Sequence, residues 1–255
     1  MNERVVAIIE ARMGSTRLPF KTLMDVAGKT LLERVVDRLK KAKSVDEVIV
    51  ATSTSVADGQ IEELCRIKNI PFFRGSENDV LGRVYEAALQ FRADIVVQCG
   101  ADCPFYDPDL VDLLVYSLAL GGYAYAANDM ELTFPEGIDA HVILVSALAD
   151  SACFATRLDE RQDTPRYIWN NKDRYPIFNL KAVPGTFYNR PEIRLTIDYT
   201  EDMELCRHIY EGFAGRGDFT TKELITLIDN HPEWAKINAA CEQQSAAYIP
   251  KEGGC

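Results

Sequence analysis

The fold is decided by residues 5–21, which read VVAIIEARMGSTRLPFK. Val5–Ile9 is a continuous apolar run of strand length, as expected for a strand that is buried on both faces of a parallel sheet. The next segment, Ala11–Lys21, holds three cations, one glycine and two hydroxyl side chains. Backbone N–H groups in such a loop can surround phosphate oxygens, while arginine and lysine neutralise their charge. The stretch therefore predicts a strand that ends in a phosphate-binding loop.

Strand and helix patterns alternate through the first half of the chain. Strands are expected at 47–51, 71–73 and 94–98, and helices at 30–39, 56–68, 79–91 and from 107 onward. Repeated crossovers of this length predict an α/β fold, a mostly parallel Rossmann-like sheet with helices on both faces. Ligands of such sheets bind outside the carboxyl ends of the strands. The loops that follow Ala11 and Gln98 are therefore the expected place of the chemistry.

The charge balance excludes several classes of protein. The chain of 255 residues has 28 basic and 39 acidic residues and a formal net charge of −11. A nucleic-acid binder usually shows a basic face, so we expect no nucleic-acid polymer as a partner. No apolar run approaches the roughly 18 residues of a spanning helix, so no membrane partner is expected either. Seven scattered cysteines without paired spacing, and no leader-like N-terminus, predict reduced thiols and a cytoplasmic protein.

A P-loop is the first alternative for the phosphate site. Gly28-Lys29-Thr30 resembles the end of that motif, but the required earlier glycine is replaced by Leu23. Gly28-Lys29 is better interpreted as a turn before a helix that Thr30 and Glu33 open with a capping box. The cluster in 11–21 could also be a solvated basic loop. Its position at the end of the first strand favours phosphate binding.

Two aspartates follow predicted strands. Asp102 lies just after 94–98, and Asp198 ends the run 193–197, which we expect to return to the main sheet. Such carboxylates can hold Mg²⁺, which binds one or two protein carboxylates and substrate phosphates. The simpler alternatives are that Asp102 caps a turn and that Asp198 caps the next helix. Together with the cationic loop, the pair predicts a nucleotidyl-transfer site.

Four segments resemble a known family. They are RMGSTRLPFK at 12–21, FRGSENDVLGR at 73–83, ADCP at 101–104 and LTID at 195–198. They are similar to the cytidylyltransferases of the spore-coat polysaccharide and acylneuraminate type and, more distantly, to 3-deoxy-manno-octulosonate cytidylyltransferase. The resemblance runs from about Val5 to Asn238. It implies a GT-A-like nucleotidyltransferase fold and transfer of CMP from CTP to an acidic sugar, with release of pyrophosphate, in polysaccharide biosynthesis.

The resemblance also implies site residues. Arg12 and Lys21 would bind the triphosphate, and Asp102 and Asp198 would hold Mg²⁺; these four are the expected catalytic residues. Arg17 is either a further phosphate ligand or the partner of a carboxylate. The other residues expected near the nucleotide are Ala11, Gly14, Ser15, Arg74, Ser76, Asp79, Gln98 and Ala101.

The sequence departs from the family pattern at three places. Glu10 stands where glutamine is expected, and His141 where a carboxylate is expected. The segment 159–166, DERQDTPR, only partly matches one that usually contains His-Val-Thr-Pro. All three concern the acceptor rather than the nucleotide, and they leave open whether the acceptor has changed. Asp139, Arg166 and Arg194 are the candidate acceptor ligands.

We expect a single domain over 1–255 with three parts. They are a nucleotide-binding half (1–127), an irregular inserted lobe for substrate and dimer contacts (128–190), and a returning strand with C-terminal helices (191–255). The expected partners are CTP and an acidic sugar of the nonulosonic or similar 2-keto-3-deoxy type, and a second copy of the chain. A different nucleotide, a sugar 1-phosphate or phosphonate acceptor, and a GT-A glycosyltransferase remain alternatives.

Overall fold

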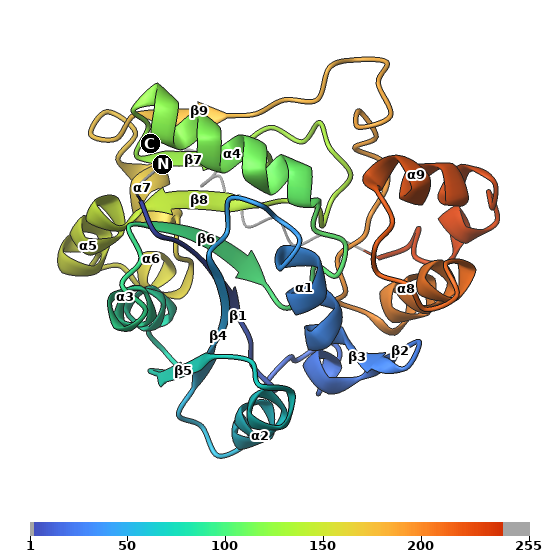
Figure 1. Cartoon of the computed structure of the whole chain (residues 1–255), viewed down its shortest axis with the longest axis horizontal. Helices are drawn as coiled ribbons and strands as arrows, with labels where there is room; N and C mark the ends of the chain where they lie inside the picture. The colour runs from blue at the N-terminus through green and yellow to red at the C-terminus, as the bar shows by residue number, and fades with distance from the viewer. Residues whose placement is uncertain (1–2, 242–255) are drawn as a thin grey trace, which may run out of the picture.

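The computed structural model describes residues 3–241 and is built on one large sheet (Figure 1). Its seven strands lie in the order β5-β4-β1-β6-β8-β7-β9. Their bounds are β1 Val5–Glu10, β4 Glu47–Ser53, β5 Phe72–Gly75, β6 Ile95–Gly100, β7 Tyr125–Ala127, β8 His141–Leu144 and β9 Ile177–Asn179. The first four strands in this order are parallel, whereas β8 runs antiparallel to both its neighbours. The predicted α/β class with a mostly parallel sheet is confirmed.

Strand β1 shows why the sheet needs helices on both faces. Its side chains alternate, so Val5, Ala7 and Ile9 join one core while Val6 and Ile8 join another. The first core packs under α1 (Leu31–Leu39), α2 (Gly59–Lys68) and α4 (Pro108–Gly121). The second packs under α3 (Val80–Gln90), α5 (Val145–Phe154) and α7 (Arg166–Asn170), with α6 (Leu158–Gln162) nearby.

A third core lies beyond α1, at the end of the molecule where Figure 1 shows α8 (Thr200–Gly212) and α9 (Thr221–Asp229). The short hairpin of β2 (Asp25–Val26) and β3 (Lys29–Thr30) connects this core to the first loop. The remaining short elements are the 3₁₀ helices η1 (Lys21–Leu23) and η2 (Trp234–Lys236). None of the helices in residues 3–241 has the length and apolar character required to cross a membrane.

Local signals placed several element ends correctly. Thr30 and Glu33 cap α1 reciprocally, with Glu33 N–H donating to Thr30 Oγ1 at 3.2 Å. Asp107 accepts hydrogen bonds from the first N–H groups of α4, and Pro108 stands at its first position. The predicted turn at Gly28 is the turn of the β2–β3 hairpin.

Two expectations about elements were wrong. Residues 193–197 do not join the main sheet, because β8 already occupies the free edge of β6. They form only an isolated bridge between Glu136 and Arg194 and bury Leu195 and Ile197 in the third core. The helix expected from residue 56 begins only at Gly59, since the Asp58 carboxylate before it binds the backbone of the first loop.

Candidate active site

A cleft of about 430 Å³ lies at the carboxyl ends of β1 and β6. The predicted side chains that line it come from the first loop and from the loop after β6. The full lining is Glu10, Ala11, Arg12, Ser15, Thr16, Arg17, Lys21, Thr22, Glu77, Asn78, Val80, Arg83, Gly100, Ala101, Asp102 and Gln162. The cleft therefore lies where the sheet topology places ligands.

The first loop is held in shape by side chains that bind its backbone and by two buried side chains of its own. Met13 N–H donates to Asp58 Oδ1 at 2.7 Å, and Thr22 Oγ1 donates to the carbonyl of Arg12 at 2.9 Å. The side chains of Met13 and Leu18 are buried and anchor the loop on the first and third cores. Arg12 is exposed, and none of the carboxylates in residues 3–241 forms an ion pair with it, so its charge is available to a ligand in the cleft.

Lys21 joins the two predicted aspartates. Its Nζ lies 2.9 Å from Asp102 Oδ2 and 3.0 Å from Asp198 Oδ1, and it also donates to the carbonyl of Ile197. Burial by itself would lower the pKa of Lys21, but the charges of Asp102 and Asp198 outweigh burial and raise it. The amine is therefore a permanent cation at the point where the carboxylates converge.

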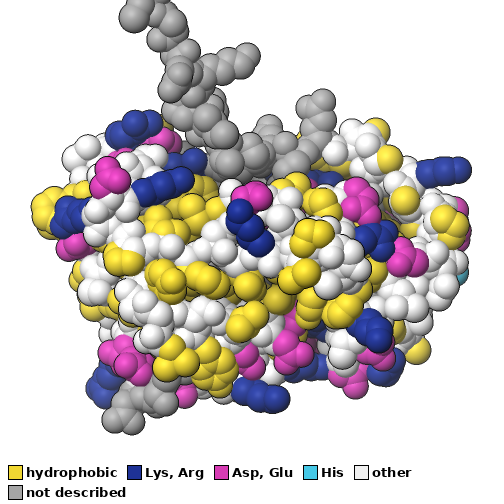
Figure 2. All heavy atoms as spheres, turned by 90° about the horizontal axis from the view of Figure 1, so that it is seen from above, with side chains coloured by type: hydrophobic (Ala, Val, Ile, Leu, Met, Phe, Trp, Pro, Cys, Tyr) yellow, Lys and Arg dark blue, Asp and Glu magenta, His cyan; other side chains and the backbone are white. Residues whose placement is uncertain are grey.

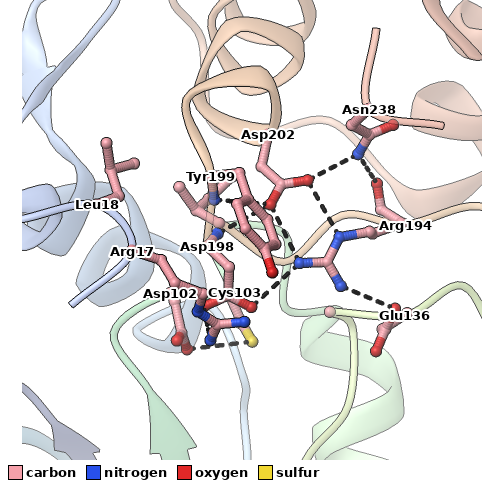
Figure 3. Close-up of polar contacts among 12 residues, drawn as sticks. Arg17, Leu18, Asp102, Cys103, Glu136, Arg194, Asp198, Tyr199, Asp202 and Asn238 are labelled. Carbon is pink, nitrogen blue, oxygen red and sulfur yellow. Dashed lines mark hydrogen bonds and ion pairs between the residues drawn. The ribbon is translucent and has the colours of Figure 1, made fainter. Parts of the chain in front are cut away.

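Asp198 is surrounded by cations. Its Oδ1 accepts from Arg17 at 2.8 Å, and its Oδ2 accepts from Arg194 at 3.1 Å (Figure 3). Burial would raise the pKa of Asp198, but Lys21 and Arg17 hold that pKa below its usual value. Arg17 Nη1 is buried without a hydrogen-bond partner. The alternative that Arg17 pairs with a carboxylate is confirmed, and its Nη1 keeps one unpaired donor.

Arg194 is fixed in an ion-paired network (Figure 3). Its guanidinium donates to both oxygens of Asp202, whose side chain is fully buried, and to Glu136 at 3.3 Å. Asp202 in turn accepts from the N–H groups of Asp198 and Tyr199 at 2.9 and 3.0 Å. Arg194 therefore positions Asp198, and its charge is already neutralised by carboxylates.

The donor set of this site suits Mg²⁺. Asp102 and Asp198 both reach one cationic atom, so the two carboxylates face a common point. Within residues 3–241 no group of three or more His, Cys, Asp or Glu side chains is arranged to hold a metal. A carboxylate pair completed by water and substrate phosphates is the usual environment of Mg²⁺. Gly100 leaves room for Asp102, because a Cβ there would lie 2.5 Å from its Oδ1.

Five residues expected near the nucleotide do not line the cleft: Gly14, Arg74, Ser76, Asp79 and Gln98. Arg74 turns away, donating to the carbonyls of Ser53 and Ser55 and pairing with Glu62 at 2.7 Å. Asp79 caps α3 and pairs with Arg161. Gln98 Nε2 donates to Glu10 Oε1 at 3.0 Å, so Gln98 contacts a residue that lines the cleft without lining it itself.

Arg83 is the main functional candidate that the sequence did not single out. It lies on α3, lines the cleft, is only 4% exposed and donates through Nη1 to the carbonyl of Ser76 at 2.6 Å. Its Nε is buried without a partner. Burial lowers the pKa of Arg83, although the carboxylate of Glu10 opposes this shift. The sequence offered one signal for Arg83, because it is the last residue of the segment 73–83 that resembles the family.

The other candidate acceptor ligands, Arg166 and Asp139, do not line the cleft. Arg166 pairs with Asp163 at 2.7 Å and lies over the ring of Trp169. Asp139 Oδ2 accepts from Gly137 N–H at 3.0 Å, while its Oδ1 is buried without a partner. Burial raises the pKa of Asp139 to about 7.

Known proteins resemble this chain over nearly its whole length. A family model described as cytidylyltransferase matches residues 6–226. The spore coat polysaccharide biosynthesis protein SpsF of Bacillus subtilis is 34% identical to this chain, and the match covers 92% of this chain and 98% of SpsF. A cytidylyltransferase structure from Leptospira borgpetersenii superposes with a TM-score of 0.85 at 29% identity, covering 92% of this chain and 97% of that one.

A more distant structure supports the fold alone. CMP:2-keto-3-deoxy-manno-octonic acid synthetase, solved in complex with CTP, has a TM-score of 0.61 at 17% identity over 82% of this chain and 98% of that one. The two proteins therefore share the fold of the sheet and its helices. The family model covers most of the chain and SpsF is similar over its full length, so the chain belongs to the cytidylyltransferase family of nucleotidyltransferases.

Proposed function

We propose that this protein transfers CMP from CTP to an acidic sugar of the nonulosonic or similar 2-keto-3-deoxy type, releasing pyrophosphate, in surface polysaccharide biosynthesis. The single observation that carries the proposal is the placement of Lys21 between Asp102 and Asp198, at the floor of a cleft lined by Arg12, Arg17 and Arg83. The CTP complex of the distant synthetase and the role of the SpsF relative in spore coat polysaccharide support the choice of substrates.

The residues act mainly by positioning and by charge. The acceptor oxygen must attack the phosphorus atom in line with the bond that breaks. The negative charge that develops must also be neutralised, and preorganised cations in a site that partly excludes water provide this. Arg12 and Arg83 would bind the outer phosphates, which leave as pyrophosphate. Lys21 and the free Nη1 of Arg17 would contact the reacting phosphate.

Asp102 and Asp198 would hold Mg²⁺ together, because their carboxylates already face one cation. When bound, the ion supplies positive charge to the triphosphate and makes a coordinated hydroxyl more acidic. Arg194 and Asp202 would keep Asp198 oriented for this role. We assign no general base, since an anomeric hydroxyl of raised acidity needs little further help.

The decisive test is a pyrophosphate-release screen with Mg²⁺. Four nucleoside triphosphates are combined with acidic sugars, sugar 1-phosphates and a phosphonate, and the Asp102→Asn protein serves as control. We expect release with CTP and an acidic sugar, and at least a ten-fold lower rate in the control. Release only with GTP, or only with sugar 1-phosphates, would contradict the proposal.

The proposal also includes a homodimeric state and a location in the cytoplasm. Figure 2 shows hydrophobic side chains gathered in a band on the face of α4 and β9. Helix α4 exposes Leu113, Tyr116 and Leu120 at helical spacing, and Leu120 is 83% exposed. A dimer would cover this stripe, so Leu120→Glu is expected to lower the mass measured by light scattering to that of one chain. An unchanged mass for the variant, or a monomeric parent protein, would contradict it.

A further inference from the structure

The guanidinium of Arg17 contacts both a carboxylate and an aromatic ring. Arg17 lines the cleft, and its Nη2 donates to Asp198 Oδ1 at 2.8 Å. Its Cζ lies over the ring of Tyr199, 5.2 Å from the ring centroid. Tyr199 itself does not line the cleft. The ring therefore supports a cleft residue without being part of the cleft surface.

The carboxylate of Asp198 is shared between cations. Its Oδ1, which accepts from Arg17, also accepts from Lys21 Nζ at 3.0 Å. Two positive charges therefore meet at one carboxylate oxygen, and they repel each other. Asp198 is also one of the two residues proposed to hold Mg²⁺. Arg17 therefore needs a second contact that does not depend on Asp198.

The ring of Tyr199 provides such a contact. The face of an aromatic ring attracts a cation, and the planar guanidinium of arginine is well suited to this interaction. A contact with the ring face also uses none of the N–H donors of the guanidinium. Within residues 3–241, Arg17 Nη1 is buried and has no hydrogen-bond partner. The ring thus restrains the guanidinium and leaves this donor for a ligand.

The backbone of Tyr199 is fixed independently of its side chain. Its N–H donates to Asp202 Oδ2 at 3.0 Å, just before the first residue of α8 (Figure 3). The same oxygen accepts from Asp198 N–H at 2.9 Å, and the Asp202 side chain is fully buried. A substitution of the Tyr199 side chain should therefore leave the start of α8 and the Asp198 backbone in place.

A restrained arginine binds a ligand at lower entropic cost than a free one. The Arg17 side chain is 29% exposed, and an exposed arginine loses rotational freedom when it is ordered by a ligand. Two contacts that order the guanidinium beforehand reduce this loss. Correct placement of a charged group also matters more in the transition state, where negative charge develops, than in the bound substrate.

We propose that Tyr199 is a positioning residue whose ring holds the guanidinium of Arg17 so that Nη1 meets the reacting phosphate of the nucleotide. This inference rests on the proposed transfer from CTP, in which Arg17 contacts that phosphate. The ring touches Arg17 and not the substrate. Its loss should therefore lower kcat more than it raises KM for CTP.

The kinetic test compares Tyr199→Leu with Tyr199→Phe in pyrophosphate release with CTP, Mg²⁺ and the acceptor found by the screen. Tyr199→Leu removes the ring and should lower kcat about ten-fold while changing KM for CTP less than about three-fold. Tyr199→Phe keeps the ring and should stay within about two-fold of the parent kcat. A kcat of Tyr199→Phe as low as that of Tyr199→Leu, or parent-like kcat in both variants, would overturn the proposal.

The matched control is Phe154→Leu. The Phe154 ring centroid lies 4.9 Å from Arg174 Cζ, and Arg174 pairs with Asp150 at 2.8 Å, so ring, arginine and carboxylate are combined in the same way outside the cleft. This variant should keep the parent kcat and KM.

A double variant tests whether the ring acts through Arg17. In a protein that already carries Arg17→Met, Tyr199→Leu should cause no further loss of kcat, because the two residues form one unit. Losses that multiply in the double variant would overturn the proposal, since the ring would then act independently of Arg17.

A readout without catalysis separates this inference from the proposed function. In protein with ¹⁵N-labelled arginine, the side-chain signal of Arg17 is identified by its absence in Arg17→Met. The ring current of residue 199 should shift this signal in the parent and in Tyr199→Phe, and the shift should be lost in Tyr199→Leu. This pattern without pyrophosphate release would refute the transfer reaction only, whereas release with a signal that is the same in all three proteins would refute the ring contact only.

Discussion

The cationic loop lies at the same edge of the sheet as a second polar cluster, and the two differ in charge. This cluster, here called the acidic wall, consists of Glu10, Gln98, Asp129, Asp139, His141 and Asp163. In the loop region the buried charges are paired: Lys21, Arg17 and Arg194 all contact Asp198. In the wall, Gln98, Asp129 and Asp139 each leave a buried oxygen without a partner. Arg17 Nη1 and Arg83 Nε also lack partners, so the unpaired atoms are donors in the cleft and acceptors in the wall.

This contrast predicts different costs of substitution. Removing one partner from a satisfied, buried ion network leaves the other charge uncompensated, which costs stability or catalysis. Removing a charge from the acidic wall should cost less stability, because its carboxylates are only partly paired. Four experiments, in order of expected effect, test this separation.

The largest effect is expected for Arg194→Met. The substitution leaves the buried carboxylates of Asp202 and Asp198 without their guanidinium, so the free energy of unfolding should fall by about 3–5 kcal/mol in urea titrations. The control Arg190→Met breaks partly exposed pairs with Asp229 and Glu192 and should cost about 1 kcal/mol or less. Equal stabilities of the two variants would show that the network is not the stronger element.

The next effect concerns catalysis by the loop. Lys21→Ala and Asp102→Asn should each lower kcat/KM for pyrophosphate release by at least 30-fold, because a preorganised charge-stabilising group contributes about 2–3 kcal/mol to the transition state. Lys29→Ala removes an exposed lysine paired with Asp37 and serves as the control. Turnover within three-fold of the parent in either site variant would remove these residues from the catalytic set.

A smaller effect is expected from the pH dependence of the wall. The pKa of Asp139 is raised from 3.8 to about 7 by burial and by Asp129, so the folded state holds a proton that the unfolded state releases. The contribution of this protonated carboxyl to the free energy of unfolding is complete below pH 3.8 and is lost as the pH rises through 7.

Asp139→Asn should remove this loss. Relative to the parent protein, the variant should gain about 1–2 kcal/mol between pH 4 and pH 7, after allowance for the partial exposure of the group. Thermal unfolding at both pH values measures the difference. A parallel pH dependence in the two proteins would mean that Asp139 ionises normally in the folded state.

The smallest effect is expected at Arg74, which the resemblance places near the nucleotide and the structure turns toward Glu62. Arg74→Met should change KM for CTP by less than about three-fold, since the lost ion pair is partly exposed and contributes about 1 kcal/mol or less. Arg83→Met, which alters the cleft itself, is the comparison and should raise KM at least ten-fold. A larger change of KM in Arg74→Met than in Arg83→Met would support the earlier placement of Arg74 near the nucleotide.

The sequence by itself determined the features that depend on neighbouring residues. The apolar run of β1, the capping box of Thr30 and Glu33, and the start of α4 at Asp107 were all predicted correctly. The place of the cationic loop in a cleft was also predicted, because its cations follow a strand directly and ligands of parallel sheets bind at the carboxyl ends of the strands.

Only the tertiary structure decided which distant groups meet. The antiparallel β8 occupies the edge of β6 and excludes residues 193–197 from the sheet, yet a hydrogen bond from Ile197 to Asp102 still brings Asp198 to the site. The same strand sets His141 beside Gln98, and α6–α7 bring Asp163 and Thr164 to the same region, where Thr164 contacts Glu10. Strand order and ion pairing depend on contacts between residues far apart in the sequence, from Gln98 and His141, which are 43 positions apart, to Arg17 and Asp198, which are 181 apart, and no local pattern encodes such contacts.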